Sequence, residues 1–574
     1  MHMEEKEQGI EKGLSRRNFL KTSALTVAGI VGTGVLMGGC GNGRKKGESD
    51  GKKTGTYAAQ EPGFLTPPAP IAEKDVKETL EADVVVVGAG MAGLNAAIAA
   101  AEEGAKVLIL EKGPTVNFRS YDYGAVNSKL QMEAGNTLNP REVTREIMRW
   151  GGYKANQKVV RLFSEQSGKV NDHLVELAQK CGCKVKSVWT KEEQMPPNAT
   201  IPNIPTLSFV LEPPAGAEEK APKSMIGGAP VVAMAYTLQT TAENMGCSFK
   251  FETPAVQLER KEGNGAVTAV FAKAKDGSIV RCKAKKGVIL CAGDYGHDQE
   301  MLDYYIPQIK GKIQKIMYPG NYNSGDGHKM GLWVGADIDE GPHAPMLFDN
   351  DLLDADGKNA GRIDAMIRQP WLSVNLRGER YANEDLPFAY ISNAVRQEAG
   401  LTRWTVWDAK YPQEAPNFHQ SACKTLKYHH RQNELDELIQ KGIVIKADTL
   451  DELAEKMKIP VDTFKKTVDR YNELAAKGDD EDFGKDKAYL TSVSQAPFYA
   501  GHIGTALLVT LGGLTINEKL QVLDKEKNII PGLYAAGNNS GSCFAVDYPI
   551  VVTGCSHGRA YTFGYLAGKS VVKN

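Results

Sequence analysis

The sequence predicts an α/β fold built on a Rossmann-like dinucleotide-binding domain. A buried strand, a glycine-rich turn and a helix follow one another from Val84, and two later strands end in small residues near Gly293 and Gly537. The chain has 574 residues, of which 42% are hydrophobic. This is enough for roughly two to four domains and excludes a disordered chain. The net charge of −1 provides no field that would attract nucleic acid.

Residues 1–40 are typical of an export signal. SRRNFLK, Ser15–Lys21, precedes an apolar run from Ala24 to Met37 that contains no acidic residue. The pattern resembles a twin-arginine signal, which exports folded proteins. The run is short for a membrane span, and it ends in a lipoprotein-like MGGC sequence at Cys40. We expect either export with a lipid anchor on Cys40, the sole membrane attachment, or cleavage to a soluble protein. Residues 41–80 are predicted to be a flexible tether.

The cysteines do not predict a metal site. Nine are present, none in a C-x-x-C arrangement, and Cys181 and Cys183 are separated by a single residue. Zinc, iron–sulfur and c-type haem sites therefore lack their usual spacings. We expect buried thiols, and a disulfide remains open.

The predicted dinucleotide site follows the tether. After the strand Val84–Val87, Gly88 permits a tight turn, Gly90 lets a pyrophosphate approach the backbone, and Gly93 lets the next helix pack against the sheet. The N-terminus of this helix faces the phosphates. The second strand ends at Glu111, which can accept hydrogen bonds from both ribose hydroxyls. An acidic residue here argues against a 2′-phosphate and leaves FAD or NAD. Three neighbours complete this set of candidates: Met91, Ala92 and Lys112.

The later strand ends favour FAD over NAD. The segments KKGVILCAGDYG and IIPGLYAAGNNSG each end a strand in small residues, at Ala292-Gly293 and at Gly537-Asn538. Three such strand ends can converge on one extended ligand. FAD reaches across a sheet to a second contact point in this way.

From Ala82 to its end the chain resembles the fumarate reductase and succinate dehydrogenase flavoprotein superfamily. The matching motifs, in order, are GAGMAG with LEK, GVILCAGDYG, SGDGHKMGLWVGA, RGERYANE, LGGLTIN, and IPGLYAAGN with TFGYLAG. The resemblance implies an FAD-binding domain interrupted by an α+β capping domain. The FAD-binding parts would be residues 81–317 and 494–574, and the cap would be residues 318–493. Helical spacing predicts a helix pair in the cap, with Leu453, Met457, Phe464, Val468 and Tyr471 on its apolar side.

Residues that bind dicarboxylates in fumarate reductases are missing. The arginine proton donor that follows the N-E of RGERYANE falls on Phe388, and the histidine ahead of L-G-G is replaced by Leu508 or Val509. A second clamp arginine is absent from SCFAVDYPIVVTG. Two desolvated carboxylates would be poorly paired without these cations. Fumarate and succinate are therefore not the expected substrates.

The tyrosines instead resemble the 3-ketosteroid Δ1-dehydrogenase branch. Tyr548 matches a Tyr-Pro tyrosine that polarises a substrate carbonyl in that branch, and Tyr390 is the phenol nearest to Phe388. Tyr123 is a third candidate, and His343 occupies a position that commonly faces substrate. Packing in the core, or a histidine satisfied at a turn, is the alternative for each. A phenol suits a carbonyl-activated alkene, because it can hydrogen-bond an enolate or deliver a proton.

Further FAD contacts are implied by the same resemblance. FRSYDYGAVNS occupies a position whose backbone wraps the flavin. It contributes Arg119, Ser120 and Gly124. Val256 and Val552 complete the predicted cofactor-binding set.

The sequence predicts an exported FAD-dependent reductase of a carbonyl-conjugated C=C bond in an enoate or enone. Respiratory relatives often carry haem or an FMN-binding domain, and neither fits between Cys40 and Ala82. A separate membrane-linked donor, a cytochrome c or an FMN-binding protein, is therefore expected. Two alternatives remain: a 3-ketosteroid-type dehydrogenase working in the oxidative direction, and a flavin electron shuttle.

Overall fold

A computed structural model describes residues 62–117, 121–188, 201, 203–219, 228–260, 265–313, 315–317, 322–354, 356–362, 367–418 and 432–574. The predicted export signal and Cys40 lie outside the described residues. Residues 61–574 form one compact unit, and the structure describes residues 62–80 of the predicted tether, whose flexibility stays a prediction. Phe64 is buried against Tyr304 and Tyr305, and the first strand already begins at Val76.

The first sheet confirms the Rossmann-like prediction. Its strands are ordered β16-β17-β8-β1-β2-β5, and β6 and β7 extend it from β8. The bounds are β16 (Gln521–Leu523), β17 (Ile529–Ala535), β8 (Ile279–Leu290), β1 (Val76–Val87), β2 (Val107–Leu110), β5 (Ser248–Lys250), β6 (Ala255–Arg260) and β7 (Val267–Lys273). From β17 to β5 all neighbours are parallel. The carboxyl ends of β17, β8, β1 and β2 therefore share one edge.

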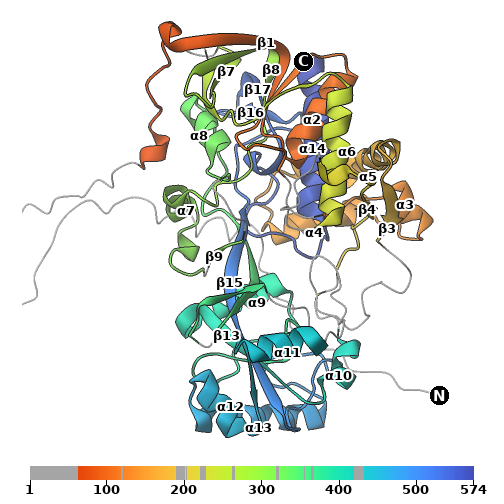
Figure 1. Ribbon diagram of the computed structural model, residues 1–574, viewed down its shortest axis with the longest axis vertical. Coiled ribbons are helices and arrows are strands. Elements are labelled where there is room, and N and C mark those ends of the chain that lie inside the picture. Colours follow the sequence, from red (N-terminus) through yellow and green to blue (C-terminus); the bar gives the residue numbers. More distant parts are fainter. Residues whose placement is uncertain are drawn as a thin grey trace, which may run out of the picture. The chain divides into compact units, whose positions relative to one another are not determined.

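Helices cover this parallel sheet (Figure 1). α2 (Met91–Glu102) follows β1 and packs along α14 (Cys555–Lys573), the last helix of the chain. Both helices carry small residues where they meet, since a side chain on Gly564 or Gly568 would overlap the backbone of α2. The other helices of this part are α3 (Lys129–Glu133), α4 (Pro140–Trp150), α5 (Gln157–Lys180), α6 (Ala229–Asn244), α7 (Gln299–Tyr305) and α8 (Asp326–Trp333). β3 (Lys184–Ser187) and β4 (Phe209–Glu212) form a separate hairpin-like pair.

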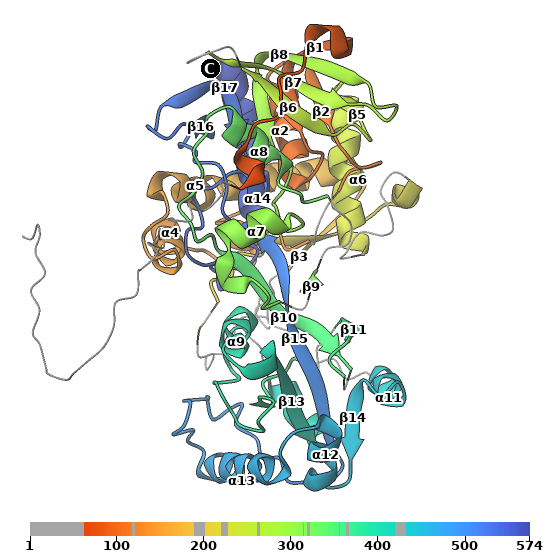
Figure 2. The ribbon, with the colours of Figure 1, turned by 90° about the vertical axis from the view of Figure 1, so that its left-hand side faces the viewer.

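A second, mostly antiparallel sheet forms the capping region, residues 345–510. Its order is β11-β10-β15-β13-β12, with β14 and the short β9 also paired to β15. The bounds are β9 (Lys315–Ile316), β10 (Pro345–Leu353), β11 (Asn359–Arg362), β12 (Leu372–Val374), β13 (Thr402–Asp408), β14 (Val444–Ala447) and β15 (Phe498–Thr510). β15 is the long strand around which this sheet is built (Figures 1 and 2).

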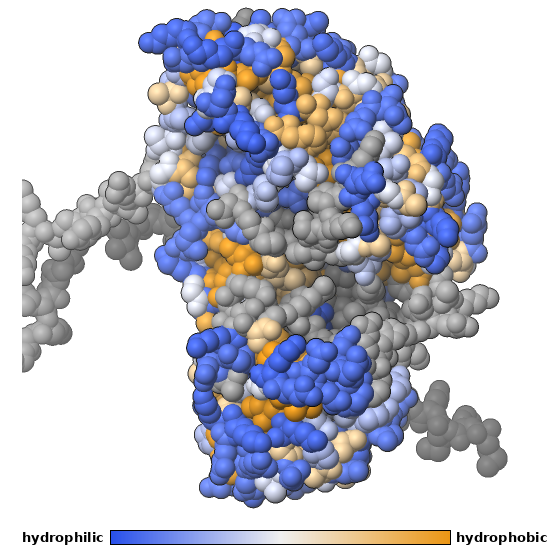
Figure 3. Space-filling model, in the orientation of Figure 1, coloured by the Kyte–Doolittle hydropathy of each residue, from blue (hydrophilic) through white to orange (hydrophobic). Residues whose placement is uncertain are grey.

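The helices of the capping region include the predicted pair. They are α9 (Phe388–Val395), α10 (Tyr411–Glu414), α11 (Gln432–Gln440), α12 (Leu450–Met457) and α13 (Val461–Lys477). The five apolar residues predicted from helical spacing are all buried in α12 and α13. Their other faces carry Lys, Glu and Asp, and the surface over these helices is mostly hydrophilic (Figure 3).

The capping boundary predicted from resemblance stays a prediction, because residues 61–574 form one compact unit. Sheet membership nevertheless marks a change. Ala336 and Ile338, placed in the cap by the prediction, form bridges with Asp524 and Leu514 instead. Apart from the short β9, the strands of the second sheet lie between Pro345 and Thr510.

Candidate functional site

Three strand ends predicted to hold a dinucleotide meet in the structure. Gly537, just after β17, lies against the start of α2, since a Cβ on it would be 2.9 Å from Cβ of Ala92. Ala292, just after β8, donates its N–H to Oδ1 of Asn539 at 2.5 Å. Asn539 in turn donates to the carbonyl oxygen of Gly293 at 3.0 Å. The carboxyl ends of β1, β8 and β17 therefore lie close together and border a single site.

The glycine-rich turn has the shape that an anion-binding helix start requires. Gly88 adopts φ +102°, and a Cβ there would be 2.5 Å from the carbonyl oxygen of Cys291. A Cβ on Gly93 would be 1.9 Å from the carbonyl oxygen of Gly88, so only glycine lets α2 pack this close to β1. At Gly90 the nearest atom to such a Cβ is the carbonyl oxygen of Asn117, at 3.3 Å.

The first turn of α2 is left open to a ligand. Gly90 precedes α2 and has no side chain that could cap the N–H groups of Met91 and the residues after it. A helix N-terminus with free N–H groups attracts phosphate through both hydrogen bonding and the helix dipole. The predicted pyrophosphate of FAD fits this cradle.

Glu111 lies at the end of β2 and is buried. Its Oε2 accepts from the N–H of Ala89 at 2.8 Å, and its Oε1 accepts from the N–H of Gly113 at 2.7 Å. Burial raises the pKa of this carboxyl, although the two N–H donors oppose the shift. Each carboxylate oxygen retains lone pairs for a ribose hydroxyl. Beside it, Thr253 donates to the carbonyl oxygen of Glu111, three residues before the half-buried Val256 in β6.

The Lys112 side chain is hydrogen-bonded and ion-paired at the N-terminus of α8. Its Nζ donates to Ser324 Oγ at 2.8 Å and forms an ion pair with Asp326 at 2.7 Å. This pair joins the end of β2 to the N-terminus of α8. In this arrangement Lys112 positions the two elements, and its predicted contact with FAD stays a prediction.

The remaining predicted cofactor residues lie near the start of α14. Gly124 donates its N–H to the carbonyl oxygen of Gly554 at 3.1 Å, and a Cβ on either glycine would overlap the other's backbone. Val552 is buried two residues before Gly554. Asn538 accepts from Arg559 Nη2 at 2.6 Å. Arg119 and Ser120 lie outside the described residues.

Asn539 and Arg559 hold these segments together, although only a helix cap was expected of Arg559. Asn539 connects β17 to β8 and also contacts His328 Nδ1 of α8 at 3.1 Å. Arg559 is fully buried in α14, where it donates to the carbonyl oxygen of Ser540 and lies over the ring of Phe544. The pair Asn538-Asn539, shortly after β17, is a feature of the sequence that could have pointed to Asn539. The burial of Arg559 could not be read from sequence, where a helix cap was the expectation.

Tyr548 lies in the loop before α14, and its hydroxyl group reaches the N-terminus of that helix. Its side chain is 2% exposed, and its hydroxyl oxygen accepts from the N–H of Ser556 at 2.9 Å. The buried cation Arg559 interacts electrostatically with this phenol. An N–H at a helix start and a nearby guanidinium both stabilise negative charge on the oxygen. Phe544 packs edge-on against the ring at 5.4 Å.

Tyr390 lies in the first turn of α9, which begins directly after Pro387. Its ring stacks on Trp150 at the end of α4, with centroids 4.7 Å apart and an interplanar angle of 13°. Burial and the charge of Asp547 raise the pKa of Tyr390 far above its usual value, and the opposing charge of Arg149 does not compensate. Tyr390 is therefore a protonated phenol at neutral pH, close to the residue that precedes Tyr548.

Tyr123 and His343 are enclosed by packing in the structure. The Tyr123 side chain is fully buried and stacks on Phe209 of β4 at 5.0 Å. His343 is 1% exposed, with Nδ1 2.7 Å from the hydroxyl of Tyr295 and Nε2 2.8 Å from the carbonyl oxygen of Asp339. Burial lowers the pKa of His343 to about 4. These contacts favour the packing alternative for both residues, and their catalytic assignment stays a prediction.

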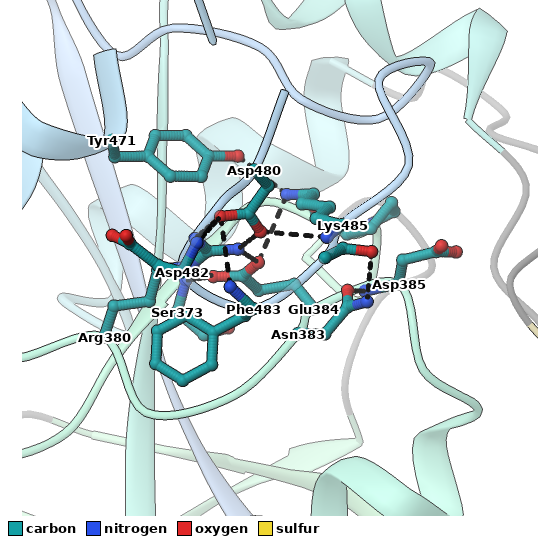
Figure 4. Close-up of polar contacts among 12 residues, drawn as sticks. Ser373, Arg380, Asn383, Glu384, Asp385, Tyr471, Asp480, Asp482, Phe483 and Lys485 are labelled. Carbon is teal, nitrogen blue, oxygen red and sulfur yellow. Dashed lines mark hydrogen bonds and ion pairs between the residues drawn. The ribbon is translucent and has the colours of Figure 1, made fainter. Parts of the chain in front are cut away.

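The stretch RGERYANE forms a buried ion network in the capping region (Figure 4). Arg380 donates to both carboxylate oxygens of Glu384 and of Asp480, at 2.6 to 2.8 Å. Lys485 donates to Tyr471 Oη at 2.7 Å and lies 3.5 Å from Glu384. Burial would raise the pKa of Glu384, but the charges of Lys485 and Arg380 outweigh it and hold the pKa low.

This network anchors the chain that leads into α9. Glu384 is followed at once by Asp385, Leu386 and Pro387, where α9 and Tyr390 begin. Arg380 and Glu384 of this charged stretch are buried and support the chain just before Tyr390, while Arg377 and Glu379 of the same stretch are exposed. The buried partners Asp480 and Lys485 come from a distant part of the chain, so their pairing was not visible in sequence.

Asp547 and Arg396 are charged residues at the same place that the sequence reasoning did not single out. Asp547 directly precedes Tyr548, and burial raises the pKa of its carboxyl to about 6, against the opposing charge of Arg396. Arg396 follows the last residue of α9. The capping helix α9 therefore brings Tyr390 and Arg396 toward the loop that carries Asp547 and Tyr548.

Other kinds of site were searched for in the described part of the chain. Within it, no group of three or more His, Cys, Asp or Glu side chains is arranged to hold a metal ion. The seven cysteines of the same ranges are free thiols. None of the helices described is both long and apolar enough to cross a membrane.

Comparison with known proteins gives matches over most of the chain. Residues 83–549 match the family described as FAD binding domain. Vinyl phenol reductase of Lactiplantibacillus plantarum is 28% identical over 85% of this chain and 95% of its own length. NADH:acrylate oxidoreductase of Vibrio harveyi is 27% identical over 87% of this chain and 51% of its own length. The solved 3-ketosteroid-Δ4-(5α)-dehydrogenase of Rhodococcus jostii RHA1 has the same fold, with a TM-score of 0.64, 24% identity, and coverage of 88% of this chain and 100% of that one.

Proposed function

Because this chain belongs to the FAD binding domain family, its cofactor is FAD and it is an FAD-dependent oxidoreductase, and we propose that it reduces a carbon–carbon double bond conjugated to a carbonyl group in a small organic molecule. The relatives named vinyl phenol reductase and NADH:acrylate oxidoreductase support a C=C reductase. The observation that carries the proposal is Tyr548, a phenol at a helix N-terminus beside a buried cation.

FAD, when bound and reduced by the electron donor, would supply a hydride for the β-carbon of the alkene. Gly88, Gly90 and Gly93 leave room for its pyrophosphate, and Glu111 is placed to accept from its ribose. Gly537 and Gly124 let the later strand end and the start of α14 approach it. These residues bind and orient the cofactor.

Tyr548 has the role of polarising the substrate carbonyl. Negative charge develops on that oxygen as the alkene accepts hydride, and a hydrogen-bond donor fixed in place stabilises it. The N–H of Ser556 and the charge of Arg559 hold the phenol in position and spread the charge. Donors that are already positioned act most strongly where water is excluded.

Tyr390 is assigned the delivery of a proton to the α-carbon. Its high pKa keeps it protonated before each cycle. Because it gives this proton to the substrate, a partner has to restore the proton afterwards. Asp547 is near enough to influence Tyr390 electrostatically, and its pKa of about 6 suits proton exchange near neutrality. The ion network around Arg380 keeps α9, and hence Tyr390, in place.

Electrons are proposed to come from a separate donor, a cytochrome c or an FMN-binding protein. Export through the twin-arginine route with a lipid anchor at Cys40 would place the enzyme beside membrane-linked donors. The sequence SRRNFLK followed by MGGC supports this location. If a Cys40→Ala variant stays with washed membranes as the native protein does, the anchor is wrong. Release into the soluble fraction is the expected result.

The proposal is tested by an anaerobic assay with reduced viologen as electron donor. Acrylate, cinnamate and benzalacetone represent enoates and enones. We expect at least one to oxidise the dye and yield the saturated product. A shuttle would oxidise the dye without substrate preference, and a dehydrogenase would instead reduce a dye while oxidising the saturated compound.

A further inference from the structure

Arg396 is a half-buried cation whose guanidinium is incompletely paired. Its Nη2 donates to Asn393 Oδ1 at 2.6 Å, and its Nη1 reaches the carbonyl oxygen of Gln308 only at 3.5 Å. Its Nε is buried and has no acceptor among the described residues. A guanidinium has five N–H donors, and neutral oxygens compensate a desolvated charge less well than a carboxylate.

Arg149 and Arg380 are paired with acids, whereas Arg396, like the buried Arg559, has only neutral oxygen acceptors among the described residues. Arg149, near Tyr390, donates through Nε and Nη2 to the two carboxylate oxygens of Glu146. Arg380 contacts two buried carboxylates, as described above. Arg396 makes no ion pair within the described ranges, although it feels the charge of Asp547.

The position of Arg396 links it to the proposed chemistry. Arg396 and Asp547 each shift the other's pKa, yet the Asp547 carboxylate takes its hydrogen bond from the N–H of Tyr548 at 2.8 Å. Tyr390, in the helix that ends just before Arg396, responds to the same Asp547 charge. The incompletely paired guanidinium therefore lies within electrostatic range of the residue that precedes Tyr548.

We propose that Arg396 binds the carboxylate of the substrate, so that the substrate is an unsaturated monocarboxylic acid and not a neutral enone. This inference rests on the proposed function and narrows it. A carboxylate matches the planar fork of arginine and would supply the missing acid. In agreement with this, the apolar Leu508 or Val509 stands in place of the histidine of dicarboxylate enzymes.

Binding of saturated ligands tests this assignment without turnover. Hydrocinnamate and propionate are compared with their amides on the oxidised holoprotein, and dissociation constants are read from the change in bound-flavin absorbance. We expect at least one acid to bind about 10- to 100-fold more tightly than its amide, the range for a hydrogen bond to a charged group. Arg396→Gln should remove this preference, whereas Arg396→Lys should restore part of it.

Arg149→Gln is the matched control, because Arg149 is an exposed arginine nearby that is already paired with Glu146. It should keep the preference for the acid. FAD content and the melting temperature of each variant show whether it folds. If Arg396 only stabilises the end of α9, the ratio of the dissociation constants for acid and amide will be the same in Arg396→Gln as in the native protein. This result would overturn the inference. Equal binding of acids and amides to the native protein would overturn it as well.

The same substrates separate this inference from the proposed function. If the native protein reduces benzalacetone but neither cinnamate nor acrylate, the carboxylate assignment fails while alkene reduction stands. If it reduces none of the three, the proposed function fails too.

Discussion

At the scale of single residues, the phenols are the clearest difference between this protein and enzymes that act on dicarboxylates. Tyr548 was found from its position before proline, and the structure adds the N–H of Ser556 and the charge of Arg559 around it. Tyr123 and His343 matched the same family pattern, yet both are enclosed by other side chains. Sequence similarity locates a residue on the chain, but only packing decides whether it meets a substrate.

Removing the hydroxyl of Tyr548 or Tyr390 should collapse turnover while FAD binding and folding persist. Loss of one acid–base or hydrogen-bonding group usually costs about 10² to 10⁴ in rate. The measurement is kcat for Tyr548→Phe and Tyr390→Phe in the viologen assay. Tyr123→Phe is the control and should retain most activity, because the ring stacks on Phe209 and its buried hydroxyl has no hydrogen-bond partner among the described residues. Native kcat in both test variants would rule out the assignment.

Asp547 predicts how activity depends on pH. Burial raises its pKa to about 6, so the protonated form that serves Tyr390 predominates below pH 6 and is lost above it. We expect kcat/KM to fall about tenfold per pH unit above that value, since this parameter follows ionisation of the free enzyme. Asp547→Asn cannot ionise and should flatten this limb at a lower rate. An unchanged limb in that variant would assign the ionisation to another group.

At the scale of elements, the βαβ unit was the most predictable part of the molecule. β1 ends at Val87, α2 covers Met91–Glu102 and β2 ends at Leu110, close to the predicted bounds. Local glycines and apolar runs determine this unit, so a single sequence contains the information. β1 begins earlier than expected, at Val76, because its first half pairs with β8, a partner about two hundred residues away.

Two glycines of this unit should differ in what they support. Gly90→Val places a side chain where only Asn117 lies near, so the protein should fold but lose FAD. Gly93→Val would drive Cβ into the carbonyl oxygen of Gly88 and should destabilise the fold itself. Flavin absorbance and thermal unfolding distinguish the two. Full flavin occupancy in Gly90→Val would mean that the phosphates bind elsewhere.

The ion network of the capping region should be a stability element. Arg380→Met leaves Glu384 and Asp480 buried without their shared cation, and breaking a buried pair costs about 3 to 5 kcal/mol. Arg377→Met, three residues away, removes the ion pairs of an exposed arginine with Glu379 and Glu398 and should cost less than about 1 kcal/mol. Free energies of unfolding from urea titrations give both values. Equal losses would show that the network contributes no more than a surface pair.

At the scale of the whole molecule, the comparisons confirm the superfamily, the FAD cofactor and the α/β fold that sequence motifs predicted. The motifs work because each reflects a local backbone requirement. The charged centre around Asp547 and Arg396 was not predictable, because its residues meet only when α9 of the capping region approaches the loop before α14. Their pairing depends on distances that no local pattern records.

The central claim is that the holoprotein passes a hydride to an alkene conjugated to a carboxylate. A single-turnover experiment tests it most directly. The holoprotein is photoreduced without oxygen and mixed with cinnamate or acrylate, and flavin absorbance is followed while the product is analysed. We predict rapid recovery of the oxidised flavin spectrum, with one saturated acid formed per flavin and a much slower recovery in Tyr548→Phe. A flavin that stays reduced with both acids, while the protein retains full FAD, would contradict this claim.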